Sequence, residues 1–271
     1  MQSRRRRRTG EEMAAKIRIP LAFAALAVWI AIMFWGAWLP HETASLAEGV
    51  TSSISTSIVA ASVFLVILVV AMRWWDIGFN APRPWNSLRV LIGPAVYLVL
   101  FFIGTLLVGW PAPHTVLILA VNTLLVGFSE ETMFRGVLFR GLRSGIPFWP
   151  AVWLTSVIFG SVHVLNATGT GDLIAAVTQA VTAFMAGTFF LALVLRTRSI
   201  VPAILFHACW DFLLVTIASS MPDPGPIEPS LISLLLPLLL DIPLFIYAIF
   251  LLRGIARQES ENGSSAATTT A

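Results

Sequence analysis

Two adjacent carboxylates, Glu130 and Glu131, lie within an apolar stretch of the chain and are followed by Arg135. Charged groups are costly in hydrocarbon, so such a cluster inside a membrane span is by default a functional-site hypothesis. On a helix, adjacent side chains point about 100° apart, whereas residues four apart with the acid first form a favourable ion pair. We therefore expect Glu131 to pair with Arg135 and Glu130 to face the interior as a base. The alternative is that both acids are structural, or that the helix ends near the headgroups.

Two later apolar stretches each contain a histidine. His163 follows Phe159 by one helical turn, and His207 precedes Asp211 by one turn. A lone histidine in a span is often only a helix–helix hydrogen-bonding residue. A carboxylate four residues from an imidazole can orient it, fix its tautomer or join it in binding a metal. Because these groups come from separate apolar stretches, we expect them to meet around one polar cavity.

The composition is that of a membrane protein. The 271 residues are 57% hydrophobic and only 11% charged, whereas a soluble domain has about 25% charged residues. The single cysteine, Cys209, excludes an intramolecular disulfide framework and a multi-cysteine zinc site. The basic residues follow membrane topology, so we do not expect nucleic-acid binding.

The apolar stretches predict an all-α, polytopic bundle of transmembrane helices. A spanning helix needs roughly 20 mainly apolar residues, and by this length we expect eight spans, of which the fifth is short. The expected spans are Pro20–Leu39, Ile54–Met72, Leu88–Trp110, Thr115–Phe139, Pro150–Leu165, Leu173–Leu195, Ile200–Ser219 and Leu231–Leu252.

The loops between these spans divide by charge. If all eight segments cross, the loops on one side contain Glu42, Glu48, Asp172, Asp223 and Glu228 but no Lys or Arg. The positive-inside rule then places both termini in the cytoplasm. The basic side carries the Arg4–Arg8 run, Lys16, Arg18, Arg73, Arg83, Arg89, Arg140, Arg143, Arg196, Arg198, Arg253 and Arg257.

Three short motifs occur in order within the expected spans. Glu130–Arg135 fits EExxxR, Phe159–His163 fits FxxxH, and His207–Asp211 fits HxxxN/D. Together they resemble the CPBP family, which comprises CAAX proteases and bacteriocin-processing proteins and is also called Abi. The resemblance covers about Thr115 to Ser219. Many relatives have Asn at the position of Asp211, although Asp also fits the motif.

The resemblance implies intramembrane proteolysis within a bundle of about eight helices. By position, Glu130 and His163 would activate the attacking water, and His207 and Asp211 would stabilise the oxyanion. Glu131 and Arg135 would support the site. Peptide hydrolysis does need a base for water and charge stabilisation at the developing oxyanion. The expected partners are the lipid bilayer and a peptide or protein substrate, with membrane-associated and lipidated substrates both open, reached through a cavity that opens toward the cytoplasm.

The need for a metal stays open at this stage. An ionised Asp211 has no proton to donate to an oxyanion, so it is either protonated or orients His207. In a third alternative, His163, His207 and either Glu130 or Asp211 would hold a divalent metal such as zinc, with a position left for water. The HExxH motif is absent. We favour catalysis without a cofactor.

The chain divides into five expected segments within an integral multi-pass protein of a prokaryotic cell membrane. Residues 1–14 and 259–271 are expected to be disordered tails. Residues 15–114 hold the first three spans, 115–219 the protease-like core and 220–258 the last span. Two rival functions are a non-enzymatic immunity or scaffold protein and a proton-coupled transporter, since buried Glu, His and Asp also form proton relays. The chain has no pair of matching halves of the transporter kind.

Overall fold

A computed structural model describes residues 2–35, 46–221 and 231–268 of the chain. These residues form helices and contain no strand, which confirms the all-α expectation. The elements in order are α1 (Gln2–Phe34), α2 (Leu46–Thr51), α3 (Thr56–Met72), η2 (Trp75–Ile77), η3 (Trp85–Leu91), α4 (Ala95–Val108), α5 (Pro113–Glu131), η4 (Thr132–Leu138), α6 (Phe139–Arg143), α7 (Phe148–Val162), η5 (His163–Asn166), α8 (Ala167–Thr170), α9 (Leu173–Thr197), α10 (Val201–Ser220) and α11 (Leu231–Thr268).

The helices fit a multi-pass membrane protein. Within the described ranges, six helices are long and apolar enough to span a bilayer. A seventh span is formed if η3 and α4, bent by 55° at their junction, count as one. Helix α3 is apolar but has only 17 residues. Every expected span therefore coincides with helix, whereas a count of eight crossings stays a prediction.

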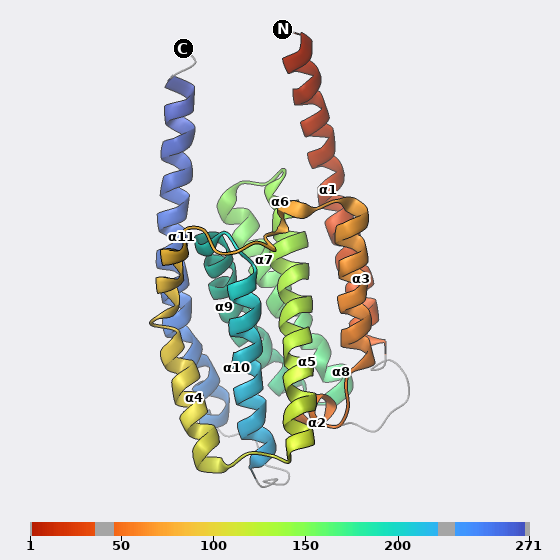
Figure 1. The fold of residues 1–271 in the computed structure, drawn as a ribbon, viewed down its shortest axis with the longest axis vertical. Coiled ribbons are helices and arrows are strands. Elements are labelled where there is room, and N and C mark those ends of the chain that lie inside the picture. The colour runs from red at the N-terminus through yellow and green to blue at the C-terminus, as the bar shows by residue number, and fades with distance from the viewer. Residues whose placement is uncertain (1, 36–45, 222–230, 269–271) are drawn as a thin grey trace.

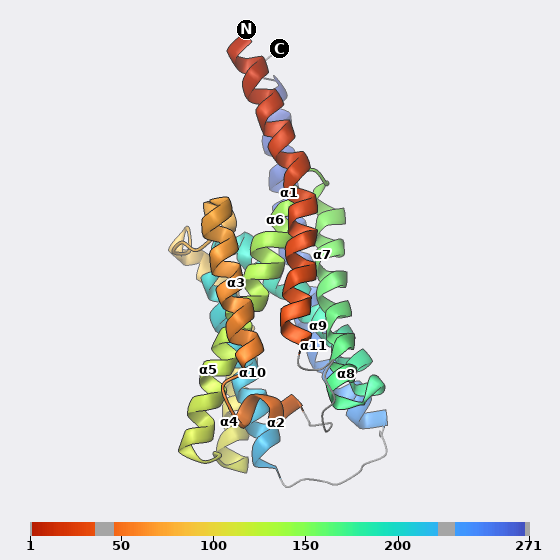
Figure 2. The same ribbon diagram turned by 90° about the vertical axis from the view of Figure 1, so that its right-hand side faces the viewer.

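The two ends of the bundle differ in charge. The N-terminal end of α1 and the C-terminal end of α11 lie at one end of the bundle (Figure 1), which also carries the arginines at the C-terminal ends of α3, α6 and α9. Helices α2 and α8 lie at the opposite end (Figure 2), where the described residues include Glu48 and Asp172 and neither Lys nor Arg. This distribution fits the positive-inside rule, and the cytoplasmic position of the termini stays a prediction. Glu42, Asp223 and Glu228 lie outside the described residues.

The terminal helices extend further than the sequence predicts. Helix α1 begins at Gln2 and α11 continues to Thr268, so the backbone is helical in both stretches expected to be tails. The first stretch contains Arg, Glu, Gln, Met and Ala, all good helix formers. Extending an existing span costs no new nucleation. The division of the chain into five segments stays a prediction.

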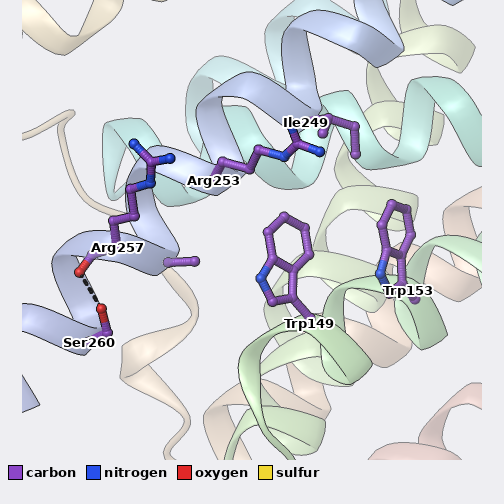
Figure 3. A pocket seen from close by; sticks show the side chains of 7 residues that line it. Trp149, Trp153, Ile249, Arg253, Arg257 and Ser260 are labelled. Carbon is purple, nitrogen blue, oxygen red and sulfur yellow. Dashed lines mark hydrogen bonds between the residues drawn. The ribbon is translucent and has the colours of Figure 1, made fainter.

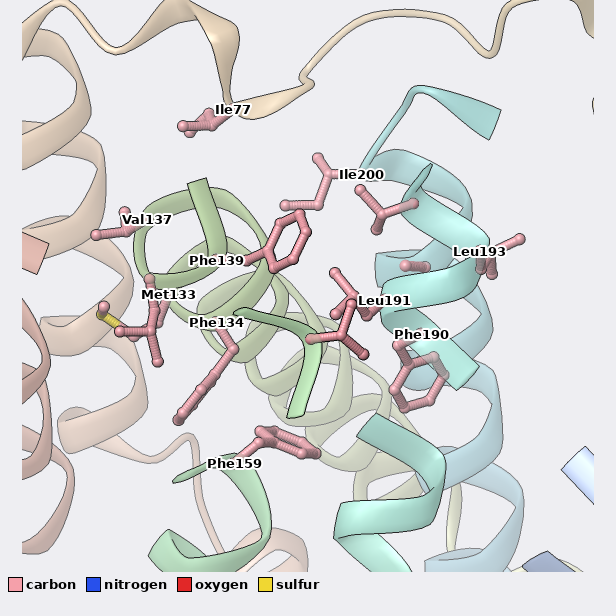
Figure 4. Packing of buried hydrophobic residues seen from close by; sticks show 14 of the residues in the cluster. Ile77, Met133, Phe134, Val137, Phe139, Phe159, Phe190, Leu191, Leu193 and Ile200 are labelled. Carbon is pink, nitrogen blue, oxygen red and sulfur yellow. The ribbon is translucent and has the colours of Figure 1, made fainter. Parts of the chain in front are cut away.

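The core is richest in aromatic and aliphatic side chains where α5 continues into η4. Phe134, Phe159 and Phe190 lie close together there, each at most 4% exposed (Figure 4). The ring of Phe134 meets that of Phe159 edge to face at 4.8 Å. Helix α9 packs against both α7 and α11, and α10 packs against α5. These contacts bring together the helices that carry the three sequence motifs.

One cavity, of about 550 Å³, lies at the arginine-rich end between α7 and α11. Trp149 and Trp153 line it on one side, and Arg253 and Arg257 line it on the other (Figure 3). None of the candidate site residues lines this cavity. The candidate site therefore lies elsewhere in the bundle.

Candidate active site

Close packing of α5 on α10 places the acids beside His207. A Cβ atom added to Gly127 would lie 2.8 Å from the carbonyl oxygen of Ile204 and 3.2 Å from the amide nitrogen of Ala208. No larger residue than glycine fits at this distance without a shift of one helix. The following turn of α5 carries Glu130 and Glu131.

The helix changes character directly after the two acids. Residues Thr132–Leu138 form π-helical turns, where the sequence predicts a continuous α-helix. Such turns occur frequently at functional sites. The expected ion pair is nevertheless formed: Nη1 of Arg135 lies 3.1 Å from Oε1 of Glu131, and both side chains are at most 1% exposed. The pairing expected from the four-residue spacing is confirmed.

Glu131 has a second partner that its spacing from Arg135 does not reveal. Its Oε1 atom also lies 2.8 Å from Nδ1 of His207. An ionised carboxylate only accepts hydrogen bonds, so Nδ1 of His207 carries the proton and donates it. Glu131 therefore fixes the orientation of His207, which is a function the sequence suggested for Asp211.

The other ring nitrogen of His207 faces two further carboxylates. Its Nε2 atom lies 3.4 Å from Oδ2 of Asp211 and 3.8 Å from Oε2 of Glu130. The imidazole is stacked on Phe190, with the ring centroids 4.6 Å apart. His207 is thus fixed by a carboxylate on one side and an aromatic face on the other, with Nε2 directed toward Glu130 and Asp211.

His163 lies where α7 ends, within the apolar stretch Phe148–Thr170 that is long enough to span a membrane. The chain tightens into a 3₁₀ turn at His163, whose backbone N–H bonds to the carbonyl of Gly160. The carbonyl of Phe159 instead lies 2.8 Å from Nδ1 of His163. Because a carbonyl can only accept, Nδ1 carries the proton, and Nε2 of the neutral ring is left as an acceptor.

Besides Glu131, Arg135 is held by Phe159 of the FxxxH motif and by Gly187, which no sequence motif marks. Its Nη2 atom donates to the carbonyl of Gly187 at 3.0 Å, and its guanidinium carbon lies 4.1 Å from the centre of the Phe159 ring. A Cβ atom at Gly187 would come within 2.6 Å of that ring, so this contact requires glycine. Gly187 and Phe190 lie in an apolar stretch of α9, and nothing in their spacing separates them from ordinary core residues.

A cavity of about 580 Å³ connects the candidate residues. Glu130, His163, His207 and Asp211 all line it, whereas Glu131 and Arg135 lie behind its wall. Oε2 of Glu130 is buried and has no hydrogen-bond partner. The structure thus brings the four residues expected at the reaction centre to one cavity, and the two expected supporting residues to the layer behind it.

The cavity leads away from the termini. Gly49 of α2 and Gly169 and Thr170 of α8 line it, and these helices lie at the end opposite the arginines (Figure 2). The sequence-based expectation was an opening toward the cytoplasm. If both termini are in the cytoplasm, the cavity extends toward the other side of the membrane, which is the reverse of that expectation.

The possible metal ligands of the site are His163, His207, Glu130 and Asp211. Among the residues that the structure describes, no three His, Cys, Asp or Glu side chains are placed to hold a metal ion. The Nδ1 atoms of both histidines are engaged by Phe159 and Glu131. The Nε2 atoms of both rings stay available, so the alternative zinc set, His163 and His207 with Glu130 or Asp211, remains a prediction.

The fold and this site define a multi-pass helical membrane protein with a polar cavity inside its bundle. Residues 112–213 match the family model described as type II CAAX prenyl endopeptidase Rce1-like. The matched residues contain all three motifs, so the match agrees with the resemblance to the CPBP family that the motifs indicate. This is a family of CAAX-type intramembrane endopeptidases. No curated protein and no solved structure matches the chain.

Proposed function

We propose that this protein hydrolyses a peptide bond with a water molecule activated by Glu130 and His163. The observation that carries the proposal is the shared cavity, in which a buried oxygen of Glu130 has no hydrogen-bond partner. A buried acceptor without a partner is costly and is satisfied by a bound water. Nε2 of His163, the acceptor nitrogen of the ring, serves as the second point of attachment for that water.

The reaction follows from these positions. The water oxygen attacks the carbonyl carbon of the scissile bond while its proton passes to Glu130. The developing oxyanion is stabilised by His207, whose Nε2–H donates when the ring is protonated. Glu130 then returns the proton to the leaving amine as the C–N bond breaks.

Asp211 and Glu131 have separate roles in this proposal. Asp211, 3.4 Å from Nε2 of His207, favours the protonated imidazole. Glu131 positions the same ring through Nδ1 and neutralises Arg135. Neither carboxylate has to donate a proton to the oxyanion, which removes the difficulty that Asp in place of Asn presents. The mechanism uses no metal.

The substrate is a peptide or protein within or at the membrane. The family name indicates prenylated C-terminal peptides, and leader peptides are an alternative of the same chemistry. A soluble peptide library and the same library with a farnesylated cysteine distinguish these classes by mass spectrometry of the products.

The test is cleavage by the purified protein and its Glu130→Ala and His163→Ala variants. Both variants are expected to lose activity by a factor of about 10² or more, because each removes a group that activates the water. Cys209→Ala is the matched control, since Cys209 lies on α10 but does not line the cavity. Full activity in both variants would exclude the mechanism. Proton flux without cleavage of any peptide would favour a transporter instead.

A further inference from the structure

The cavity between α7 and α11 lies where the apolar part of the bundle ends. Its lining on α11 begins at Ile249 and includes Arg253 and Arg257, so the apolar run of this helix gives way to charged residues within the cavity. On α7 the lining residues are Trp149 and Trp153, in the first two turns of the helix. Tryptophan is enriched at the level of the lipid headgroups. The cavity therefore lies at the boundary between hydrocarbon and headgroups.

Two arginines of this cavity carry charges without a counterion among the described residues. Arg253 and Arg257 are four residues apart, so they lie on one face of α11. Both are exposed, and neither guanidinium forms an ion pair or a hydrogen bond within the described part of the chain. Of the nearby acids, Glu259 is engaged by Arg143 at 3.0 Å, and Glu261 forms no ion pair with another described residue. The cavity thus favours an anion.

The opposite wall of the cavity is aromatic. The rings of Trp149 and Trp153 stack with their centroids 5.9 Å apart, and neither indole N–H has a hydrogen-bond partner in the described ranges. The ring of Trp153 in turn lies 6.3 Å from that of Phe184 on α9 and 6.5 Å from that of Phe245 on α11. Helices α7 and α11 each pack against α9. An aromatic cluster therefore leads from the arginines toward the apolar interior of the bilayer.

We propose that this cavity binds the phosphate of an anionic phospholipid headgroup, with Arg253 and Arg257 as cationic ligands and the indole N–H groups of Trp149 and Trp153 as further donors. Guanidinium groups bind phosphate through charge-assisted hydrogen bonds, and basic pockets between transmembrane helices bind anionic headgroups. The acyl chains lie along the aromatic cluster. The bound lipid joins α7 to α11 at a site separate from the candidate active site.

Native mass spectrometry of the purified full chain in detergent tests this site. The probes are phosphatidylglycerol and phosphatidylcholine with the same acyl chains, added separately over a range of concentrations. The unsubstituted protein is expected to bind its first phosphatidylglycerol more tightly than its first phosphatidylcholine. Arg253→Gln/Arg257→Gln should weaken the binding of phosphatidylglycerol by about tenfold or more, because each arginine attracts the anionic headgroup.

Arg73→Gln/Arg83→Gln is the matched control. It removes two exposed arginines from the same end of the bundle, and neither of them lines the cavity. The control should bind phosphatidylglycerol as the unsubstituted protein does. Equal weakening in the two double variants would indicate a diffuse attraction to the basic end and would overturn the site. Unchanged binding in Arg253→Gln/Arg257→Gln, or equal affinity of the unsubstituted protein for the two lipids, would also overturn it.

Two further measurements separate the site from unfolding and from free phosphate. Trp149→Leu keeps both arginines and should weaken the binding of phosphatidylglycerol roughly fivefold, as expected for one lost hydrogen bond. Every variant should keep its unfolding temperature in lipid-free detergent, because the substituted groups have no polar partner within the described residues. A large excess of inorganic phosphate should leave the lipid bound. Its displacement by phosphate, or unchanged binding in Trp149→Leu, would overturn the proposed lipid site.

Discussion

At the scale of single residues, the site depends on how one carboxylate oxygen is shared. Oε1 of Glu131 accepts from both Arg135 and His207, so it fixes a cation and an imidazole at once. Glu130, the next residue, has no such partners and faces the cavity. Two identical neighbouring side chains therefore have different tasks because the helix directs them to different surroundings.

The two acids should respond differently to the same substitution. Glu131→Gln removes the negative charge beside a fully buried Arg135 and should lower the free energy of unfolding by about 3–5 kcal/mol. Glu130→Gln keeps the shape of a residue without an arginine partner and should leave stability within about 1 kcal/mol while reducing cleavage by about 10²–10⁴. Chemical unfolding in detergent and the peptide assay measure these effects. Equal losses of stability in both variants would contradict the division of roles.

The residue-scale pattern was only partly predictable. The spacing of Glu131 and Arg135 was sufficient to predict their ion pair, because residues four apart meet on one helix. The bond from His207 to Glu131 joins residues 76 positions apart, and spacing carries no information about it. Gly187 and Phe190 could not be singled out, since they act through a carbonyl and a ring within an otherwise apolar helix.

At the scale of elements, the site depends on the approach of α5 to α10. The positions of the helices were predictable from the lengths of the apolar stretches, because a span needs enough apolar residues to cross the bilayer. The π-helical turns of η4 and the end of α7 at Val162 did not follow, since tertiary packing decides them. The end of α7 is what frees the carbonyl that holds His163.

Gly127→Ala tests the approach of the two helices. The added methyl group would meet backbone atoms of α10 at 2.8 Å, so the helices must separate. The expected result is a loss of about 1–3 kcal/mol in unfolding free energy, together with lower cleavage because His207 moves from Glu131. Gly254→Ala, with no atom within 4 Å of its added Cβ, should have neither effect. Similar behaviour of the two variants would show that the contact is not tight.

A second prediction concerns the ion pair that joins α1 to η2. Both terminal guanidinium nitrogens of Arg18, Nη1 and Nη2, contact Asp76, at 2.8 and 2.9 Å. Burial raises the pKa of Asp76, but the hydrogen bond and charge of Arg18 outweigh it and hold the pKa below its ordinary value. A lowered pKa contributes stability that is present above the ordinary value and is lost as pH falls through the folded-state value.

In the Asp76→Asn variant, thermal stability should therefore fall less steeply as the pH is lowered from about 5 to about 2. The difference should stay below about 1 kcal/mol, because the carboxylate is half exposed. Unfolding temperatures in detergent across this range provide the measurement. Arg18→Gln should flatten the curve in the same way, since it removes the same partner. An unchanged acid dependence in both variants would show that the pair does not contribute.

At the scale of the whole molecule, the bundle encloses a cavity lined by acids and histidines within a hydrocarbon-compatible exterior. Its fold class and the order of its spans were predictable because the bilayer imposes helix length and charge asymmetry. The direction of the cavity was not predictable, because it depends on how α2 and α8 pack between spans. The buried residues of η4 thus close the site at the arginine-rich end, and the cavity extends toward the opposite end of the bundle.

The absence of a metal step leads to a prediction for the intact protein. Dialysis against a strong zinc chelator should leave peptide cleavage within about twofold, because the proposed water is activated by side chains alone. The same treatment of a zinc-dependent protease serves as the positive control. Loss of activity that zinc restores would contradict the metal-free mechanism while leaving the site residues in place.

The central claim is that Glu130 and His163 act on one water molecule, and a double-mutant cycle tests it most directly. Cleavage rates are measured for the purified protein, Glu130→Gln, His163→Ala and the double variant. Groups that act as a unit show strongly non-additive losses, so the double variant should be no slower than the more damaged single variant. Losses that multiply, or a single variant that keeps the full rate, would contradict the account.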